Sequence, residues 1–195
     1  MAYVPKEALD GNALFEGYHR KLPDGGAAPY LCPARVATIG YGTTRYPSGR
    51  AVRLQDPPIT KETAREYMAN DLQIAAKAVD NYARVLLHDL QRSALIMFTN
   101  NCGTGALQHS TLLWAVNRKD WPKAGREFLK WVNGGGQRLT GLVRRRQYES
   151  EMFLRGAALL GDKPEAPSAP AVPMPQASAP RQKQSWWSWF WPWRE

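Results

Sequence analysis

Residues 37–43, Ala-Thr-Ile-Gly-Tyr-Gly-Thr, decide the fold of this chain. The β-branched and aromatic residues of this stretch predict a short strand. Gly40 and Gly42 allow tight bends where the strand ends. A second β-type run follows at residues 51–54. We therefore predict a small sheet, with the hydroxyl group of Thr38 on one of its strands.

Two short elements precede this stretch: residues 15–17 are Phe-Glu-Gly, and residues 30–32 are Tyr-Leu-Cys. The carboxyl group of Glu16 lies next to apolar residues, a setting in which desolvation can raise a pKa. On its own, a glutamate before a glycine is typical of an exposed helix end. Cys32 on its own is typical of a small buried residue. Any role for either residue therefore depends on the rest of the chain.

The chain after residue 59 has a helical pattern. Thr60 is typical of an N-cap. The apolar residues that follow it, at positions 64, 67, 68, 72, 75, 76 and 79, recur with the helical period. Residues 94–98 form the most apolar stretch and predict a buried helix that ends at Gly103. A small sheet followed by helices indicates an α+β fold.

Two more helices are predicted before residue 160. Asp120 precedes Trp121 and Pro122 as the cap of a helix that ends at the glycines of residues 134–136. Thr140 is expected to cap the last helix. The basic run in that helix, Arg-Arg-Arg at residues 144–146, is typical of a solvated face.

The composition sets limits on partners and cofactors. The chain has 26 Lys and Arg residues against 17 Asp and Glu, and its net charge of +9 favours anionic partners. Cys32 and Cys102 are too few for a disulfide framework, so we expect reduced thiols. His19, His88 and His109 are too scattered to suggest a metal site. We predict neither a metal nor a cofactor.

A change in composition near residue 161 divides the chain into three parts. We predict a globular domain at residues 1–160, a linker rich in Pro and Ala at residues 161–184, and a Trp-rich tail at residues 185–195. The linker alternates proline with small residues and cannot form a core.

The Trp-rich tail is far shorter than the roughly 20 apolar residues that span a bilayer. Its rings and the flanking positive charges predict docking onto an anionic membrane or lipopolysaccharide. Sugar stacking and packing against the core are the alternatives. The residues expected to bind the membrane are Trp186, Trp187, Trp189, Phe190, Trp191 and Trp193.

Taken together, these motifs resemble the phage-type lysozymes, the endolysins of glycoside hydrolase family 24. The resemblance starts at Phe-Glu-Gly and Tyr-Leu-Cys and reaches Thr-Ile-Gly-Tyr-Gly at residues 38–42. It continues through residues 94–106, 110–113, 128–131 and 141–146. It covers about residues 7–160 and implies a lysozyme-like fold, with a small antiparallel sheet followed by a mainly helical lobe.

The resemblance also implies a catalytic acid, Glu16, and a second catalytic position that is aspartate in some members and cysteine in others. Alignment through Thr38 places Cys32 there. Asp24 competes, because its separation from Glu16 is near the usual spacing, but its Pro-Asp-Gly-Gly context is typical of a turn. The chain departs from the family pattern in an apparent insertion within residues 19–29, and also at residue 35, where arginine replaces the usual glycine.

The implied reaction is hydrolysis of the β-1,4 bond between N-acetylmuramic acid and N-acetylglucosamine in bacterial peptidoglycan. Glu16 would protonate the leaving oxygen. Either Cys32 and Thr38 hold the attacking water, or Cys32 attacks the anomeric carbon. Two other interpretations stay open: a lytic transglycosylase, which uses an acid and no water, and a membrane-active lysis protein that acts through its cationic Trp-rich tail.

The expected partner is peptidoglycan, with no nucleic acid, and the expected state is a monomer. The first residues lack a basic region followed by an apolar run, so we expect no secretory signal. The resemblance then implies a bacteriophage product that stays in the host cytoplasm until a holin opens the membrane and releases it to the periplasm for host cell lysis.

Overall fold

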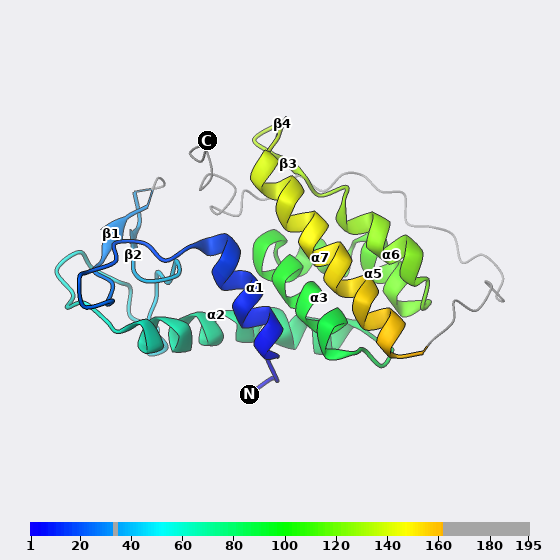
Figure 1. Ribbon diagram of the computed structural model, residues 1–195, viewed down its shortest axis with the longest axis horizontal. Coiled ribbons are helices and arrows are strands. Elements are labelled where there is room, and N and C mark those ends of the chain that lie inside the picture. Colours follow the sequence, from blue (N-terminus) through cyan, green and yellow to red (C-terminus); the bar gives the residue numbers. More distant parts are fainter. Residues whose placement is uncertain (33–34, 162–195) are drawn as a thin grey trace.

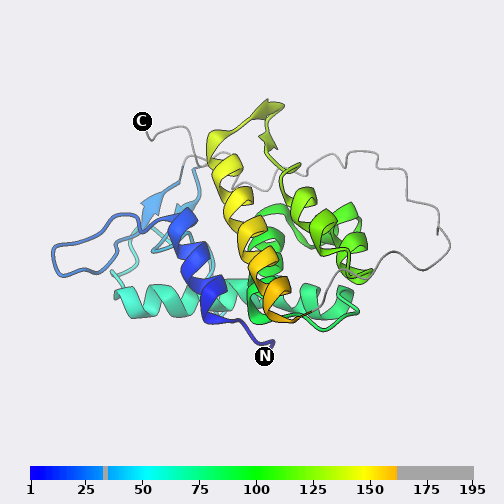
Figure 2. The same ribbon diagram turned by 45° about the vertical axis from the view of Figure 1, so that its right-hand side comes forward.

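Helix α2 (Lys61–Tyr82) connects a small lobe of short strands and loops with a larger helical lobe (Figures 1 and 2). The structure, a computed structural model, describes residues 1–32 and 35–161. The predicted Trp-rich tail and all but the first residue of the predicted linker lie outside the described residues. The described part has the predicted α+β architecture, with small antiparallel strand pairs and a mainly helical lobe.

Helix α2 begins where the sequence predicts it. The Thr60 side chain accepts a hydrogen bond of 3.1 Å from the backbone N–H of Thr63, which satisfies one free donor of the first turn. The residues buried along the helix follow its period and face the rest of the molecule. They are Ala64, Met68, Leu72, Ala75, Ala76, Ala78 and Val79.

The small lobe contains strands β1 (Tyr30–Leu31) and β2 (Ala37–Thr38), which pair antiparallel with Tyr30 opposite Thr38. Gly40 has a φ of 62°, and a Cβ atom there would lie 2.7 Å from the Cβ of Ala64 on α2. Both the turn and the close approach of α2 therefore require glycine. The predicted run at residues 51–54 contributes only an isolated bridge between Ala51 and Arg45.

The helical lobe is built around α3 (Asp89–Cys102), which packs against α1, α2 and α7. The predicted apolar stretch, residues 94–98, is fully buried in α3, and the helix ends before Gly103, whose φ is 95°. The other helices are α1 (Lys6–Glu16), α4 (Thr104–Gln108), α5 (Thr111–Asn117), α6 (Trp121–Phe128) and α7 (Thr140–Leu159).

Two predicted helix boundaries were wrong. Asp120 caps α6 as expected, but the helix ends at Phe128, and the glycines beyond it form a hairpin of β3 (Asn133–Gly134) and β4 (Gln137–Arg138). Positive φ angles at residues 135 and 136 form its turn. Thr140 is the first residue of α7 and makes no cap, because the N-cap position is Leu139.

Candidate active site

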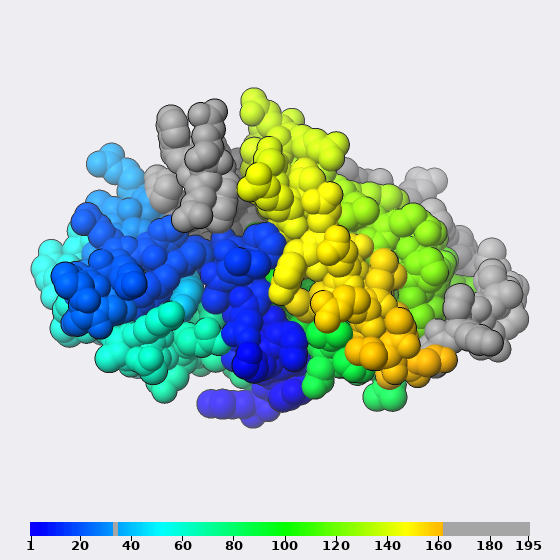
Figure 3. Space-filling view, in the orientation of Figure 1, coloured from blue at the N-terminus to red at the C-terminus, as the bar shows by residue number. Residues whose placement is uncertain are grey.

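Glu16 is the last residue of α1, at the point where the chain leaves the helical lobe for the small lobe (Figure 1). Gly17 follows with a φ of 71° and turns the chain out of the helix. Glu16 is only 9% exposed, so it differs from the exposed residue that is typical of a helix end. Figure 3 shows α1 at the surface between the small lobe and α7.

The Glu16 carboxylate is held by Arg145 of α7. Arg145 Nη1 donates a hydrogen bond of 2.8 Å to Glu16 Oε1, and Nη2 donates one of 2.9 Å to Asn12 Oδ1 on α1. Its Nε donates to Glu149 Oε1 at 3.1 Å. Because Arg145 uses all three nitrogens on partners in α1 and α7, the guanidinium fixes the position of the Glu16 side chain.

A second buried arginine extends this network. Arg146 is fully buried, with its Nη1 3.2 Å from Glu149 Oε2 and its Nη2 2.6 Å from Asn101 Oδ1. Burial raises the pKa of Glu149, against the opposing charges of Arg146 and Arg145. Burial disfavours the charge of Arg145, yet the charges of Glu16 and Glu149 raise its pKa. Two arginines and two glutamates thus compensate one another in the interior.

The prediction of a solvated basic face at residues 144–146 was therefore wrong for two of its three residues. Only Arg144 is exposed, while Arg145 and Arg146 point into the protein. Glu149 lies four and three positions after these two arginines, which is the spacing of ion pairs on one helix. That spacing indicates ion pairs along the helix, but it is the same on an exposed helix face and does not by itself predict burial.

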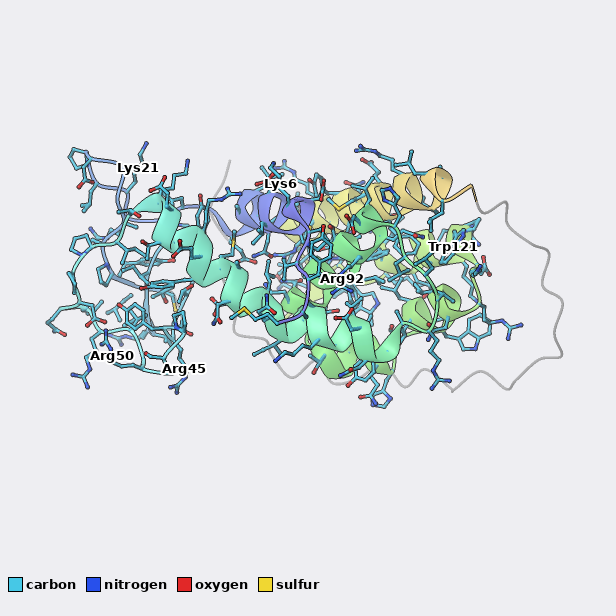
Figure 4. All side chains as sticks on the ribbon, turned by 90° about the horizontal axis from the view of Figure 1, so that it is seen from below. Lys6, Lys21, Arg45, Arg50, Arg92 and Trp121 are labelled. Carbon is cyan, nitrogen blue, oxygen red and sulfur yellow. The ribbon has the colours of Figure 1, made fainter. Side chains whose placement is uncertain are left out.

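Positive charge does reach solvent on the small lobe. Lys21, Arg45 and Arg50 project outward from it (Figure 4). Arg50 is paired with Asp56 at 2.9 Å and lies over the ring of Tyr46. The Arg50 side chain holds the pKa of Asp56 at about 2, together with the backbone N–H of Arg53.

On the opposite side of the site, β1 and β2 position the other two predicted residues. Cys32 follows β1, is 3% exposed and carries a free thiol. Its backbone N–H donates to the carbonyl of Val36 at 3.0 Å. Thr38 is fully buried in β2, and its Oγ1 donates to the same carbonyl at 3.0 Å. One backbone carbonyl, that of Val36, therefore accepts hydrogen bonds from both Cys32 and Thr38.

Arg35, which follows the two residues outside the described part, has a strained backbone conformation. Its backbone N–H donates to the carbonyl of Cys32 at 2.7 Å, and its φ is 57°, in the left-handed region that favours glycine. Because this backbone conformation favours glycine, an arginine is unusual at position 35.

Tyr30 and His19 link the Glu16 side of the site to the sheet. The His19 ring lies 5.4 Å from the Tyr30 ring, and His19 Nε2 is 2.9 Å from the carbonyl oxygen of Glu16. Burial raises the pKa of Tyr30, and the nearby Glu16 adds to this effect. These contacts connect the end of α1, where Glu16 lies, to β1, the strand that Cys32 follows.

The competing residue, Asp24, forms a turn. Its Oδ1 accepts a hydrogen bond of 2.9 Å from the backbone N–H of Gly26, and the carbonyl of that glycine accepts from Leu22. The apparent insertion around it is anchored by bridges from Ala27 to Lys21 and to Ile59, which precedes α2.

Within residues 1–32 and 35–161, no group of three His, Cys, Asp or Glu side chains could hold a metal ion. No helix in this same part of the chain has the length and apolar character needed to cross a membrane.

Comparison with known proteins places this chain in a family. The sequence model of the phage lysozyme family matches residues 21–149, a range that begins after Glu16. The endolysin of Bacillus phage B103 is 41% identical over 98 residues, which cover 50% of this chain and only 37% of that longer protein. The endolysin of Acyrthosiphon pisum secondary endosymbiont phage 1 is 34% identical over 128 residues, covering 64% of this chain and 84% of that protein.

A solved structure shares the whole architecture. The crystal structure of a mutant of P22 lysozyme is 28% identical to this chain and matches it with a TM-score of 0.69. The match covers 79% of this chain and 99% of the P22 protein, so it includes both lobes. The family match, the endolysin relatives and the shared architecture together show that this chain belongs to the phage lysozyme family.

Proposed function

We propose that the protein hydrolyses the β-1,4 bond between N-acetylmuramic acid and N-acetylglucosamine in peptidoglycan. One observation carries this proposal. The buried Glu16 is linked through His19 and Tyr30 to the strand pair of the other lobe, where Thr38 is buried opposite Tyr30 and the buried Cys32 follows β1. Glycoside hydrolysis needs such a pair of groups, one on each side of the bond that breaks.

Glu16 serves as the acid that protonates the leaving oxygen. Arg145 and Asn12 fix the end of α1, and their hydrogen bonds leave Oε2 of Glu16 without a contact to Arg145. A carboxyl group held in this way keeps its orientation while the substrate binds, which favours proton transfer in one direction.

Cys32 and Thr38 act on the other face of the sugar. The Thr38 hydroxyl hydrogen is already donated to Val36, so its remaining lone pair can accept a hydrogen bond from water. Thr38 therefore suits the role of a water-positioning group. Cys32 either shares that role or attacks the anomeric carbon as a thiolate, which is a better nucleophile than the thiol.

The reaction products test the proposal. Purified peptidoglycan is digested, and the fragments are identified by mass spectrometry. Hydrolysis of the proposed bond gives reducing muramic acid ends. A lytic transglycosylase gives anhydro ends, and cleavage of peptide bonds leaves the glycan strands intact. Either of these products would overturn the proposal.

The two cysteines of the chain allow a matched test of the thiol. Cys32→Ala is compared with Cys102→Ala, which removes the other free thiol, at the end of α3. We expect the rate of glycan cleavage to fall by about 100-fold or more for Cys32→Ala and to stay near wild type for Cys102→Ala. Full activity of Cys32→Ala would assign Cys32 to packing alone.

A further inference from the structure

Tyr30 has a hydroxyl group that the fold itself does not use. The residue lies in β1 opposite Thr38, two positions before Cys32, and is 9% exposed. Its oxygen is buried and forms no hydrogen bond within the described residues. A buried polar group without a partner lowers stability, so its retention needs an explanation.

Tyr30 differs in position from the other described residues that have a buried polar side-chain atom without a hydrogen-bond partner. Arg146 and Glu149 are paired with each other, so their remaining atoms belong to the ion-pair network. The other buried side-chain atoms without a partner lie on α2, α3 and α6, away from the sheet. They belong to Gln73, Gln91, Ser93 and Trp121. Tyr30 alone among them lies on the strand pair of the candidate active site.

The surroundings keep the Tyr30 hydroxyl protonated and oriented. Burial raises its pKa far above the ordinary value for tyrosine, and the nearby Glu16 acts in the same direction. The group is therefore a neutral hydrogen-bond donor at any pH near neutrality. The ring packs against His19 at 5.4 Å, which limits the directions in which the hydroxyl can point.

We propose that Tyr30 binds the substrate, with its hydroxyl donating a hydrogen bond to a hydroxyl or acetamido oxygen of the sugar that lies between Glu16 and Cys32. This inference rests on the proposed glycosidase function. The donor is already removed from water in the free protein, so a sugar oxygen that reaches it gains a hydrogen bond with little further desolvation. A site that contains such a group also discriminates against ligands that leave it unpaired.

The variant Tyr30→Phe tests this inference, because it removes only the oxygen. We expect kcat/KM on purified peptidoglycan to fall roughly 10-fold to 100-fold. We expect the thermal unfolding midpoint to stay the same or to rise, because no hydrogen bond within the protein is lost. A purely structural hydroxyl predicts the reverse, a lower midpoint with unchanged kcat/KM, and that result would overturn the inference.

Tyr46→Phe is the matched control in the same lobe. The Tyr46 hydroxyl donates to Asp56 Oδ2 at 2.8 Å, so its removal should lower the unfolding midpoint without changing kcat/KM. Binding is measured separately in the Glu16→Gln background, with soluble glycan fragments as the probe. There, Tyr30→Phe should raise Kd roughly 10-fold, and an unchanged Kd would contradict substrate binding.

The two proposals fail in different ways. If the wild-type protein releases no reducing ends from peptidoglycan, the proposed function is wrong, whatever Tyr30 does. If the wild type is active and Tyr30→Phe is equally active, the proposed function stands and only the role of Tyr30 is wrong.

Discussion

Arg145 donates a hydrogen bond of 2.8 Å to Glu16 across 129 positions of the sequence. This contact fastens the end of α1 to α7 and fixes the residue proposed as the catalytic acid. The same arginine contacts Glu149, so the acid shares its counter-charge with a buried carboxylate. We therefore expect both stability and the proposed catalysis to depend on Arg145.

Replacement of Arg145 by Met should destabilise the protein by about 3 to 5 kcal/mol, because it leaves two buried carboxylates with less compensation. Urea unfolding followed by circular dichroism measures this loss. Arg144→Met is the control, because Arg144 is the neighbour of Arg145 in sequence and its side chain is exposed. This substitution should change the free energy of unfolding by less than about 0.5 kcal/mol. Equal effects of the two substitutions would show that the buried network adds no stability.

Asp71 should make the stability of the small lobe dependent on pH. Burial raises its pKa to about 6, although the hydroxyl of Thr43 donates a hydrogen bond of 2.8 Å to it. Among the described ion pairs, none includes Asp71. The folded protein therefore binds this proton more tightly than the unfolded chain, and the associated stability is lost as pH rises through about 6.

Asp71→Asn removes the free-energy cost of ionising this buried carboxyl group at high pH. We expect the variant to gain about 3 kcal/mol relative to wild type at pH 8, with the gain disappearing below pH 4. Thr43→Val should raise the pKa of Asp71 further, because it removes the donor that favours the charged form. A stability difference between Asp71→Asn and wild type that does not vary with pH would contradict the assignment.

Arg35→Gly should stabilise the protein by about 0.5 to 1 kcal/mol, because glycine adopts a φ of 57° without steric cost. Arg35→Ala separates this backbone effect from loss of charge, since alanine keeps the strain. Thermal unfolding of the three proteins checks the prediction. If alanine and glycine raise the midpoint equally, the charge of Arg35 and not its backbone conformation is responsible.

A chain that ends at residue 161 should cleave purified peptidoglycan at the wild-type rate, because all proposed site residues precede that point. The same truncation should reduce lysis of intact cells, since it removes the Trp-rich tail predicted to dock onto anionic membranes, together with the flanking Arg181 and Lys183. A full-length variant with serine at the six aromatic positions of the tail should match the truncated chain. Unchanged lysis of intact cells by both would exclude a role for the tail.

Local signals in the sequence predicted much of the fold. Thr60 before a regular apolar pattern located α2, and the apolar run before Gly103 located α3. Helix α1 has no such signal, because Gly11 lies in its middle. A Cβ atom at Gly11 would lie 2.6 Å from the Sδ of Met97 on α3. The glycine that weakens the local helical pattern is thus required by tertiary packing.

The candidate site was predicted in part. Motifs near each other in sequence identified Glu16, Cys32 and Thr38, and their catalytic roles stay predictions. Arg145 was missed, because a run of three arginines has the same local pattern whether it is solvated or buried. Only partners supplied by α1 and α3, far away in sequence, decide between the two environments.

The most direct test of the account compares Glu16→Gln with wild type in the release of reducing ends from purified peptidoglycan. Glu7→Gln is the matched control, with the same chemical change at an exposed position of the same helix. We predict that Glu16→Gln lowers the rate by at least about 100-fold while Glu7→Gln keeps it near wild type. A folded Glu16→Gln variant that releases reducing ends at the wild-type rate would contradict the central claim that Glu16 is the catalytic acid.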